Sequence, residues 1–161
     1  MVKKIYIAGP LFNKHEQMYL EDIAEELEGN GYDCFLPHRD QTGIDESELK
    51  STEFLSQDTK DIIFKTDLDA LDAADLTVAL LSGQDIDSGT SAEIGFTYAK
   101  GKPIIGVDAF ERRYRNLFVE GMITKKINSV SELIDSIKEL DWNPNFFKPS
   151  NPKSPSPFRA I

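Results

Sequence analysis

Short runs of β-branched and aromatic residues alternate with segments of helical periodicity along most of this 161-residue chain, and no other feature constrains its fold as strongly. The predicted strands cover residues 3–8, 32–36, 76–81, 103–107 and a short piece within 122–127, and the predicted helices cover about 14–28, 58–74, 91–99 and 131–140. Such alternation is typical of βαβ units. We therefore expect one flavodoxin-like α/β domain with a mainly parallel five-stranded sheet and helices on both faces.

The domain is expected to span residues 1–142. From residue 143 the composition changes to Asn, Pro, Lys and Ser with scattered Phe, so residues 143–161 are predicted to form an extended Pro/Ser-rich tail. A polar stretch at 38–56 has no period of its own and is interpreted as a long loop that covers the functional site. Four side chains of the first helix are predicted to face the core, namely Met18, Ile23, Ala24 and Leu27.

Charge and composition exclude several classes of function. The net charge of -10 repels phosphate backbones, and the basic segment 111–115 is too short to outweigh it, so we expect no binding to nucleic acid. Gly9-Pro10 interrupts the first apolar run too early for a signal peptide, and no run approaches a membrane span, so we expect a cytoplasmic protein. The single cysteine, Cys34, allows no internal disulfide or multi-thiolate metal site and is expected to be buried and inert.

The loop after the third predicted strand is the richest in functional groups. It reads Ser82-Gly-Gln-Asp-Ile-Asp87-Ser-Gly89-Thr90-Ser-Ala-Glu93-Ile-Gly95. Ligands of such sheets bind outside the carboxyl ends of the strands, where this loop begins. Glu93 has two interpretations here: it can close a capping box with Thr90, or it can be a reactive carboxylate. Asp87 likewise can form an Asx turn before Gly89 or face a cleft.

Asp67 favours the interpretation of Glu93 as a reactive group. It lies on the apolar stripe of its predicted helix, where a carboxylate is costly unless it is paired, hydrogen-bonded or needed. The other members of this stripe are Phe64, Leu71 and Ala74. Carboxylates that converge on one cleft suit glycosidic-bond chemistry, in which one captures the sugar and another protonates the leaving base. This chemistry requires neither a metal nor an organic cofactor.

Five motifs follow one another along the chain: Ile5-Tyr6-Ile-Ala-Gly9-Pro10-Leu-Phe12, Leu36-Pro37 with a polar loop, Asp67-Leu68, Asp87-x-Gly89-x-x-x-Glu93-x-Gly95-x-x-x-Ala99, and Asn116-Leu117. In this order they resemble the nucleoside 2-deoxyribosyltransferase family over roughly residues 3 to 140. The resemblance implies transfer of a 2-deoxyribosyl group between nucleobases through a covalent deoxyribosyl-glutamate intermediate, with slow hydrolysis when no acceptor base is present. It also implies nucleosides and free nucleobases as ligands and a place in nucleotide salvage.

The resemblance further implies roles for single residues. Glu93 corresponds to the nucleophile and Asp67 to the proton donor that contacts the base. The implied substrate-binding residues are Tyr6, Gly9, Phe12, Gln41, Asp87, Gly89 and Asn116. Among them Tyr6 orients the nucleophile, Phe12 walls the base pocket, and Asp87 binds the sugar hydroxyls or the base. Asn116 reaches into a neighbouring subunit's site, which implies a homo-oligomer, either a dimer or a hexamer. Arg39 and Asp40, beside Gln41, lie where the family places base-reading contacts.

Three other functions are considered, of which the second fails and the first and third stay open. A 2′-deoxynucleoside 5′-monophosphate N-glycosidase would use the same nucleophile with water as acceptor, although Asp87 would repel a 5′-phosphate. A phospho-acceptor signalling domain shares the scaffold, but it needs acids where this chain has Ala8-Gly9-Pro10 and Leu81-Ser82. A non-catalytic nucleotide-binding module would use the same pocket without turnover.

The C-terminal segment 155–161 departs from the family, whose members often end in a compact aromatic tail.

Overall fold

The computed structural model describes residues 1–44, 55–83, 85–108 and 116–142. Five strands form one sheet in the order β2-β1-β3-β4-β5, and every neighbouring pair is parallel. The strands are β1 (Lys4–Ala8), β2 (Asp33–Phe35), β3 (Leu76–Leu81), β4 (Ile104–Asp108) and β5 (Lys125–Ile127). This strand order is that of flavodoxin-like domains, so the predicted fold class is confirmed.

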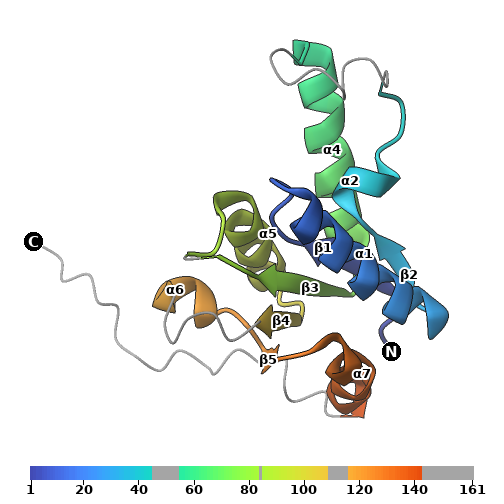
Figure 1. Ribbon diagram of the computed structural model, residues 1–161, viewed down its shortest axis with the longest axis vertical. Coiled ribbons are helices and arrows are strands. Elements are labelled where there is room, and N and C mark those ends of the chain that lie inside the picture. The colour runs from blue at the N-terminus through green and yellow to red at the C-terminus, as the bar shows by residue number, and fades with distance from the viewer. Residues whose placement is uncertain (45–54, 84, 109–115, 143–161) are drawn as a thin grey trace, which may run out of the picture.

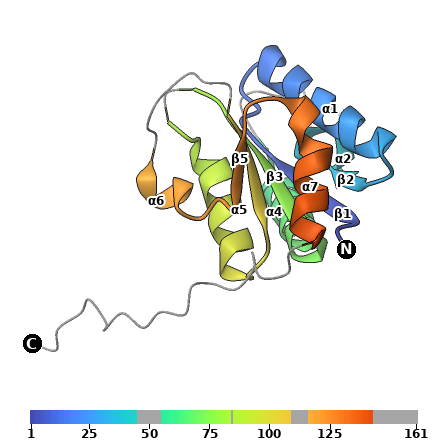
Figure 2. The same ribbon diagram turned by 90° about the horizontal axis from the view of Figure 1, so that it is seen from below.

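Helices cover both faces of the sheet (Figure 1). They are α1 (Lys14–Gly29), α2 (Pro37–Asp40), α4 (Gln57–Ala73), α5 (Ser88–Ala99), α6 (Leu117–Glu120) and α7 (Leu133–Trp142), the last preceded by a 3-10 turn at Val130–Glu132. Figure 2 shows α1 and α7 on one face, with α4 and α5 on the other. Within the described ranges, no helix combines the length and the apolar character needed to cross a bilayer.

Side chains of β1 alternate between two cores, one on each face of the sheet. Ile5 and Ile7 pack with buried residues of α1 and α7. Tyr6 and Ala8 pack with residues of α4, α5 and α6. This alternation follows from the two-residue period of a strand, and burial on both faces is expected of a parallel sheet. The face that carries Tyr6 is the face on which the candidate site is built.

Gly9 follows β1 at a point where the chain passes very close to α1. A Cβ added to Gly9 would lie 2.6 Å from Leu20 Cδ2 and 3.1 Å from Leu80 Cβ. Both distances are shorter than ordinary carbon contacts, so no side chain fits there without movement of its neighbours. Gly9 therefore has a packing role, and its predicted contact with substrate stays a prediction.

The structure differs from the predicted elements at three places. Helices α2 and α6 were not predicted, and α2 lies at the start of the stretch interpreted as a loop. Helix α5 begins at Ser88, three residues before the predicted start. The remainder of the predicted loop at 45–54, the basic segment 111–115 and the predicted tail 143–161 lie outside the described residues.

One prediction about the core is wrong. Met18 is 50% exposed, whereas Leu20, Ile23, Ala24 and Leu27 of α1 are buried. Leu20 precedes Ile23 and Ala24 by three and four residues, which is the spacing of one helical face. Met18 lies two residues before Leu20 and therefore points away from this face.

Cys34 lies on β2 and is half-buried. Burial, together with the charge of Glu28, raises the pKa of its thiol to about 12. A thiol with such a pKa forms almost no thiolate at neutral pH and is a poor nucleophile. This agrees with the inert cysteine expected from the sequence.

Candidate active site

Glu93, in the second turn of α5, is the centre of the candidate site. The Tyr6 hydroxyl donates a hydrogen bond to Glu93 Oε1 at 2.6 Å. Tyr6 is completely buried, and its ring stacks on that of Phe35 with the ring centroids 5.6 Å apart. Because β1 and β2 hold both rings in place, the hydroxyl is a fixed donor that orients the Glu93 carboxylate.

The backbone of Glu93 is tied to the sheet by two buried hydroxyl groups. Thr97 Oγ1 donates to the carbonyl oxygen of Glu93 at 2.9 Å. The Thr97 hydroxyl oxygen in turn lies 2.8 Å from Thr77 Oγ1 of β3, within hydrogen-bond distance. The turn of α5 that carries Glu93 is thus fixed against β3, while Tyr6 fixes its side chain from β1.

Asp87 is the residue that begins α5. Its Oδ1 accepts from the Gly89 N–H at 3.0 Å, and its Oδ2 accepts from the N–H of Thr90 at 2.9 Å and from the Thr90 hydroxyl. The Asx turn considered for Asp87 is therefore present. The capping box considered for Thr90 and Glu93 is not formed, because Asp87 is the cap residue and the Glu93 carboxylate bonds to Tyr6.

Asp67 of α4 faces the same region from the neighbouring helix. Gln41, the residue after α2, donates from Nε2 to Asp67 Oδ1 at 2.7 Å. Asp67 shares its stripe with Leu71 and Ala74, which are buried as predicted. Phe64, the fourth member of that stripe, is 69% exposed and borders the pocket described below instead of joining the core.

Burial raises the pKa of both carboxyl groups. The pKa of Glu93 rises from 4.5 to about 7, chiefly through desolvation; the Tyr6 hydrogen bond opposes the rise, and the charges of Asp67 and Asp87 add to it. The pKa of Asp67 rises from 3.8 to about 6, again through desolvation and against the hydrogen bond from Gln41. Interacting carboxyls that titrate near neutral pH can share one proton, so that one acts as a nucleophile while the other is an acid.

An apolar pocket of about 390 Å³ opens beside the two carboxyl groups, between α4 and α5. Besides Asp67 and Glu93, its lining residues are Phe64, Leu68, Leu71, Gly89, Ala92 and Phe96. This volume is within the range of small-molecule sites, roughly 300–1,000 Å³. Walls of phenyl rings and leucines suit a flat heterocycle, and the two carboxyls supply the polar contacts.

Phe12 and Asn116 lie outside the apolar pocket. Phe12 is 79% exposed in the segment between β1 and α1. Asn116 is exposed at the start of α6, where its Oδ1 accepts from the N–H groups of Phe118 and Val119 at 3.0 and 3.2 Å. The roles expected of Phe12 at the base and of Asn116 in a neighbouring subunit stay predictions.

Arg39 and Asp40 are turned towards α1. Arg39 bonds to Glu28 of that helix and to Asp40. Of the three adjacent residues expected to read the base, Gln41 is the one that reaches a carboxyl group of the candidate site.

Two buried polar atoms at the edge of the sheet where ligands of this fold bind have no hydrogen-bond partner among the described residues. They are Gln41 Oε1, next to Asp67, and Ser82 Oγ, at the carboxyl end of β3. Buried oxygens without partners are costly, and they suit a ligand that brings N–H or O–H groups. The parts of the chain that the structure describes hold no group of three or more His, Cys, Asp or Glu side chains suited to a metal ion.

Sequence reasoning missed several supporting residues. Phe96 and Thr97 follow Glu93 by three and four residues, so helical spacing could have placed them on the same side of α5. Phe35 carried no such signal, because its stacking on Tyr6 depends on the register between β1 and β2, in which these two residues are partners.

The sequence model of nucleoside 2-deoxyribosyltransferases matches residues 5–137. The chain belongs to this family. This is a family of enzymes with deoxyribosyltransferase or N-glycosidase activity. No curated protein gives a significant match.

Solved structures support the family assignment. A conserved protein from Enterococcus faecalis V583 is 27% identical with a TM-score of 0.70, over 86% of this chain and 99% of that one. A 2-deoxyribosyltransferase from Bacillus psychrosaccharolyticus is 27% identical with a TM-score of 0.67, over 81% of this chain and 89% of that one. The CMP N-glycosidase BcmB from Clostridium botulinum is 23% identical with a TM-score of 0.54, over 84% of this chain and 99% of that one, and shows the shared fold alone.

Proposed function

We propose that this protein transfers the 2-deoxyribosyl group of a nucleoside to a second nucleobase, with Glu93 as nucleophile and Asp67 as proton donor. The observation that carries the proposal is the hydrogen bond from buried Tyr6 to Glu93, beside a second carboxyl group and an apolar pocket. Membership of the family and the likeness to the Bacillus 2-deoxyribosyltransferase support it.

In the first half of the reaction, the ionised Glu93 carboxylate attacks C1′ of the bound nucleoside. The bond between C1′ and the base nitrogen breaks as the ester to Glu93 forms, and protonated Asp67 gives its proton to the departing base. Positive charge develops at C1′, and the carboxylate of Glu93 stabilises it. The raised pKa of Asp67 keeps a usable fraction of its carboxyl protonated near pH 6.

In the second half, an acceptor base occupies the place that the first base has left. Its ring nitrogen attacks C1′, the ester to Glu93 breaks, and Asp67 takes up the proton that the nitrogen releases. Each displacement inverts C1′, so the product keeps the configuration of the donor. Water that reaches the ester instead of a base gives slow hydrolysis.

Asp87 favours nucleosides over nucleoside 5′-monophosphates as donors. Asp87 caps the start of α5, and Glu93 lies in the second turn of the same helix, so Asp87 is near the place of a sugar bound at Glu93. Hydrogen bonds from Gly89 and Thr90 hold the carboxylate at that position. A 5′-phosphate within a few Å would meet repulsion of about 1–4 kcal/mol.

The proposal extends to a homo-oligomer in which Asn116 reaches a neighbouring site. Asn116 is exposed and lies outside the apolar pocket of its own chain, so it is free to contact a ligand in the site of another subunit. Leu117 and Phe118, which follow it, are 68% and 80% exposed and offer apolar surface to a neighbour. The Oδ1 of Asn116 caps α6, so its amide nitrogen would contact the ligand.

Product analysis by chromatography tests the reaction. Incubation with deoxyinosine and free adenine is expected to yield deoxyadenosine and hypoxanthine, and Glu93→Ala is expected to yield neither. Glu25→Ala, at an exposed position of α1, is the matched control and should keep full activity.

A separate incubation with deoxyadenosine 5′-monophosphate is expected to release no adenine. Adenine and deoxyribose 5-phosphate from this mixture alone would replace the proposal by a monophosphate N-glycosidase. Deoxyinosine that binds and stays intact, equally with the unaltered protein and with Glu93→Ala, would indicate a non-catalytic nucleotide-binding module.

A further inference from the structure

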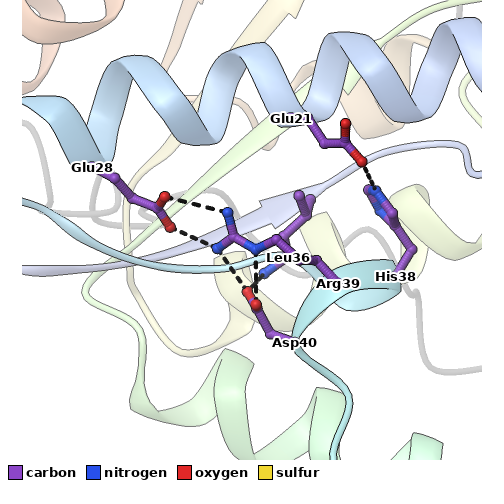
Figure 3. Close-up of polar contacts among 6 residues, drawn as sticks. All are labelled: Glu21, Glu28, Leu36, His38, Arg39 and Asp40. Carbon is purple, nitrogen blue, oxygen red and sulfur yellow. Dashed lines mark hydrogen bonds and ion pairs between the residues drawn. The ribbon is translucent and has the colours of Figure 1, made fainter.

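A cluster of ion pairs ties α2 to α1 (Figure 3). Arg39 Nη2 and Nη1 donate to the two carboxylate oxygens of Glu28 at 2.6 and 3.2 Å. Nε and Nη2 of the same guanidinium donate to the carboxylate of Asp40 at 2.8 and 2.9 Å. Asp40 in turn accepts from the backbone N–H of Leu36 at 2.8 Å, which closes the turn of α2.

The position of α2 depends on these contacts. A helix of four residues is too short to be stable by itself. A second contact joins it to α1, since His38 Nε2 lies 3.1 Å from Glu21 Oε1 (Figure 3). Glu21 and Glu28 are about two turns apart on α1, so α2 is held at two points along that helix.

Gln41 follows α2 directly and is its C-terminal cap residue. Its Nε2 donates to Asp67 Oδ1 at 2.7 Å. A continuous chain of contacts therefore runs from Glu28 through Arg39 and the backbone of α2 to Gln41, and from there to Asp67. The position of the Gln41 amide, which donates to Asp67, therefore depends on the position of α2.

We propose that Arg39, gripped by Glu28, is a positioning residue that holds Gln41 against Asp67 and thereby orients the proton donor. The inference rests on the proposed function, because the orientation of Asp67 affects turnover only if this carboxyl acts on the base. Arg39 does not read the base directly, because its guanidinium is engaged by the carboxylates of Glu28 and Asp40.

Nuclear magnetic resonance tests the positioning without any reference to activity. The side-chain amide signal of Gln41 is assigned by its loss in Gln41→Leu. In the unaltered protein this signal should differ from that of a free glutamine amide, because the amide donates to Asp67. Arg39→Gln removes the ion pair with Glu28 and should move the signal towards the chemical shift of a free glutamine amide. Glu28→Gln, which changes the partner on α1, should move it in the same direction.

Kinetics test the consequence for turnover. We expect Arg39→Gln to lower kcat for transfer about ten-fold, since a small displacement of a catalytic group is costly. The same change made in a Gln41→Leu background should cause no further loss, because Arg39 acts through Gln41. A merely structural role of Arg39 would give losses that multiply.

Glu139→Gln is the matched control. It removes a carboxylate from the ion pair with Lys125, between α7 and β5, and that pair has no contact with the candidate site. It should leave both the Gln41 signal and kcat unchanged. An unmoved Gln41 signal in Arg39→Gln, unchanged kcat, or multiplying losses in the double variant would each overturn the inference. An unaltered protein with no turnover would instead refute the proposed function, and the amide signal would still decide the positioning.

Discussion

At the scale of single residues, the two carboxyls of the site differ in the donor that each one has. Glu93 receives a hydrogen bond from the phenol of Tyr6, and Asp67 receives one from the amide of Gln41. Tyr6 cannot move, because its ring is buried and stacked, whereas Gln41 depends on a short helix at the surface. The proposed reaction needs Glu93 ionised and Asp67 protonated, so these donors influence which protonation state of the pair is populated.

Tyr6→Phe tests the donor to Glu93. The ring and its stacking are kept, but the hydrogen bond that opposes the rise of the Glu93 pKa is lost, so this pKa should increase further above 7. Because Glu93 attacks as the carboxylate, the acidic limb of the profile of kcat/KM against pH should move to higher pH. We expect kcat/KM at pH 6.5 to fall about ten-fold for each unit by which this pKa rises, because the ionised fraction of Glu93 falls by that factor. A profile identical to that of the unaltered protein would show that Tyr6 has no part in ionisation.

Asp67→Asn tests the proton donor. The variant should lose transfer from deoxyinosine by about a hundred-fold or more, because general acid catalysis contributes on that order. In a donor such as 7-methyl-2′-deoxyguanosine the base is already cationic and can leave without being protonated. The Asp67→Asn variant should therefore cleave this donor at nearly the normal rate. Asp69→Asn, two residues along the same helix and exposed, is the control and should behave as the unaltered protein with both donors. Equal losses with both donors would assign Asp67 to binding alone.

At the scale of elements, the predictable helices and strands are those with a long hydrophobic period of their own. α1, α4 and β3 have such a period, and their predicted ends agree with the structure within two residues. α2 and α6 have four residues each, and their positions depend on contacts distant in sequence, such as that of Arg39 with Glu28. The early start of α5 depends on Asp87, which the sequence offered as a turn residue but not as a helix cap.

Gly9 and Gly95 give contrasting predictions for the packing of elements. Gly9→Ala would bring a methyl group within 2.6 Å of Leu20, between β1 and α1, and should lower the free energy of unfolding by about 1–3 kcal/mol. Gly95→Ala lies in α5 with no atom within 4 Å of the added carbon, and helix propensity should raise the same free energy by about 0.5–1 kcal/mol. Urea unfolding measures both values. Equal effects at the two positions would refute the close approach at Gly9.

At the scale of the whole molecule, the sequence predicted the fold correctly, and it named the residues of the candidate site without the contacts between them. The topology brings Gln41 and the start of α5, which carries Glu93, to one edge of the sheet, because the connections at the carboxyl ends of parallel strands converge. Asp67 lies inside α4, so its approach to Glu93 depends on how α4 packs beside α5. The partners of these residues depend on register and rotamers, which no local pattern encodes. For this reason the capping box at Thr90 was a reasonable but wrong interpretation, and Arg39 was expected at the base but lies against α1.

The buried carboxyls should also affect the stability of the whole molecule. The pKa of Glu93 in the folded protein is raised to about 7 from 4.5, so its contribution to stability is fully present below pH 4.5 and is lost as the pH rises through 7. Glutamine at position 93 cannot ionise, so the Glu93→Gln variant does not lose stability as the pH rises through 7. We expect it to raise the free energy of unfolding at pH 8 by about 1–2 kcal/mol and to change it little at pH 4. Urea unfolding at the two values, with Glu25→Gln as an exposed control, measures the difference, and a variant less stable at pH 8 would contradict it.

The alternation of β1 between two cores makes strand alignment a condition for chemistry. In the observed alignment, Tyr6 pairs with Thr77 of β3 and Phe35 of β2, and its hydroxyl faces Glu93. A slip of β1 by one residue would turn the phenol to the opposite side of the sheet, with Ile5 or Ile7 in its place. Such a chain would bury nearly the same apolar surface and still be inert. Correct folding of this protein is therefore better judged by turnover than by compactness or helical content.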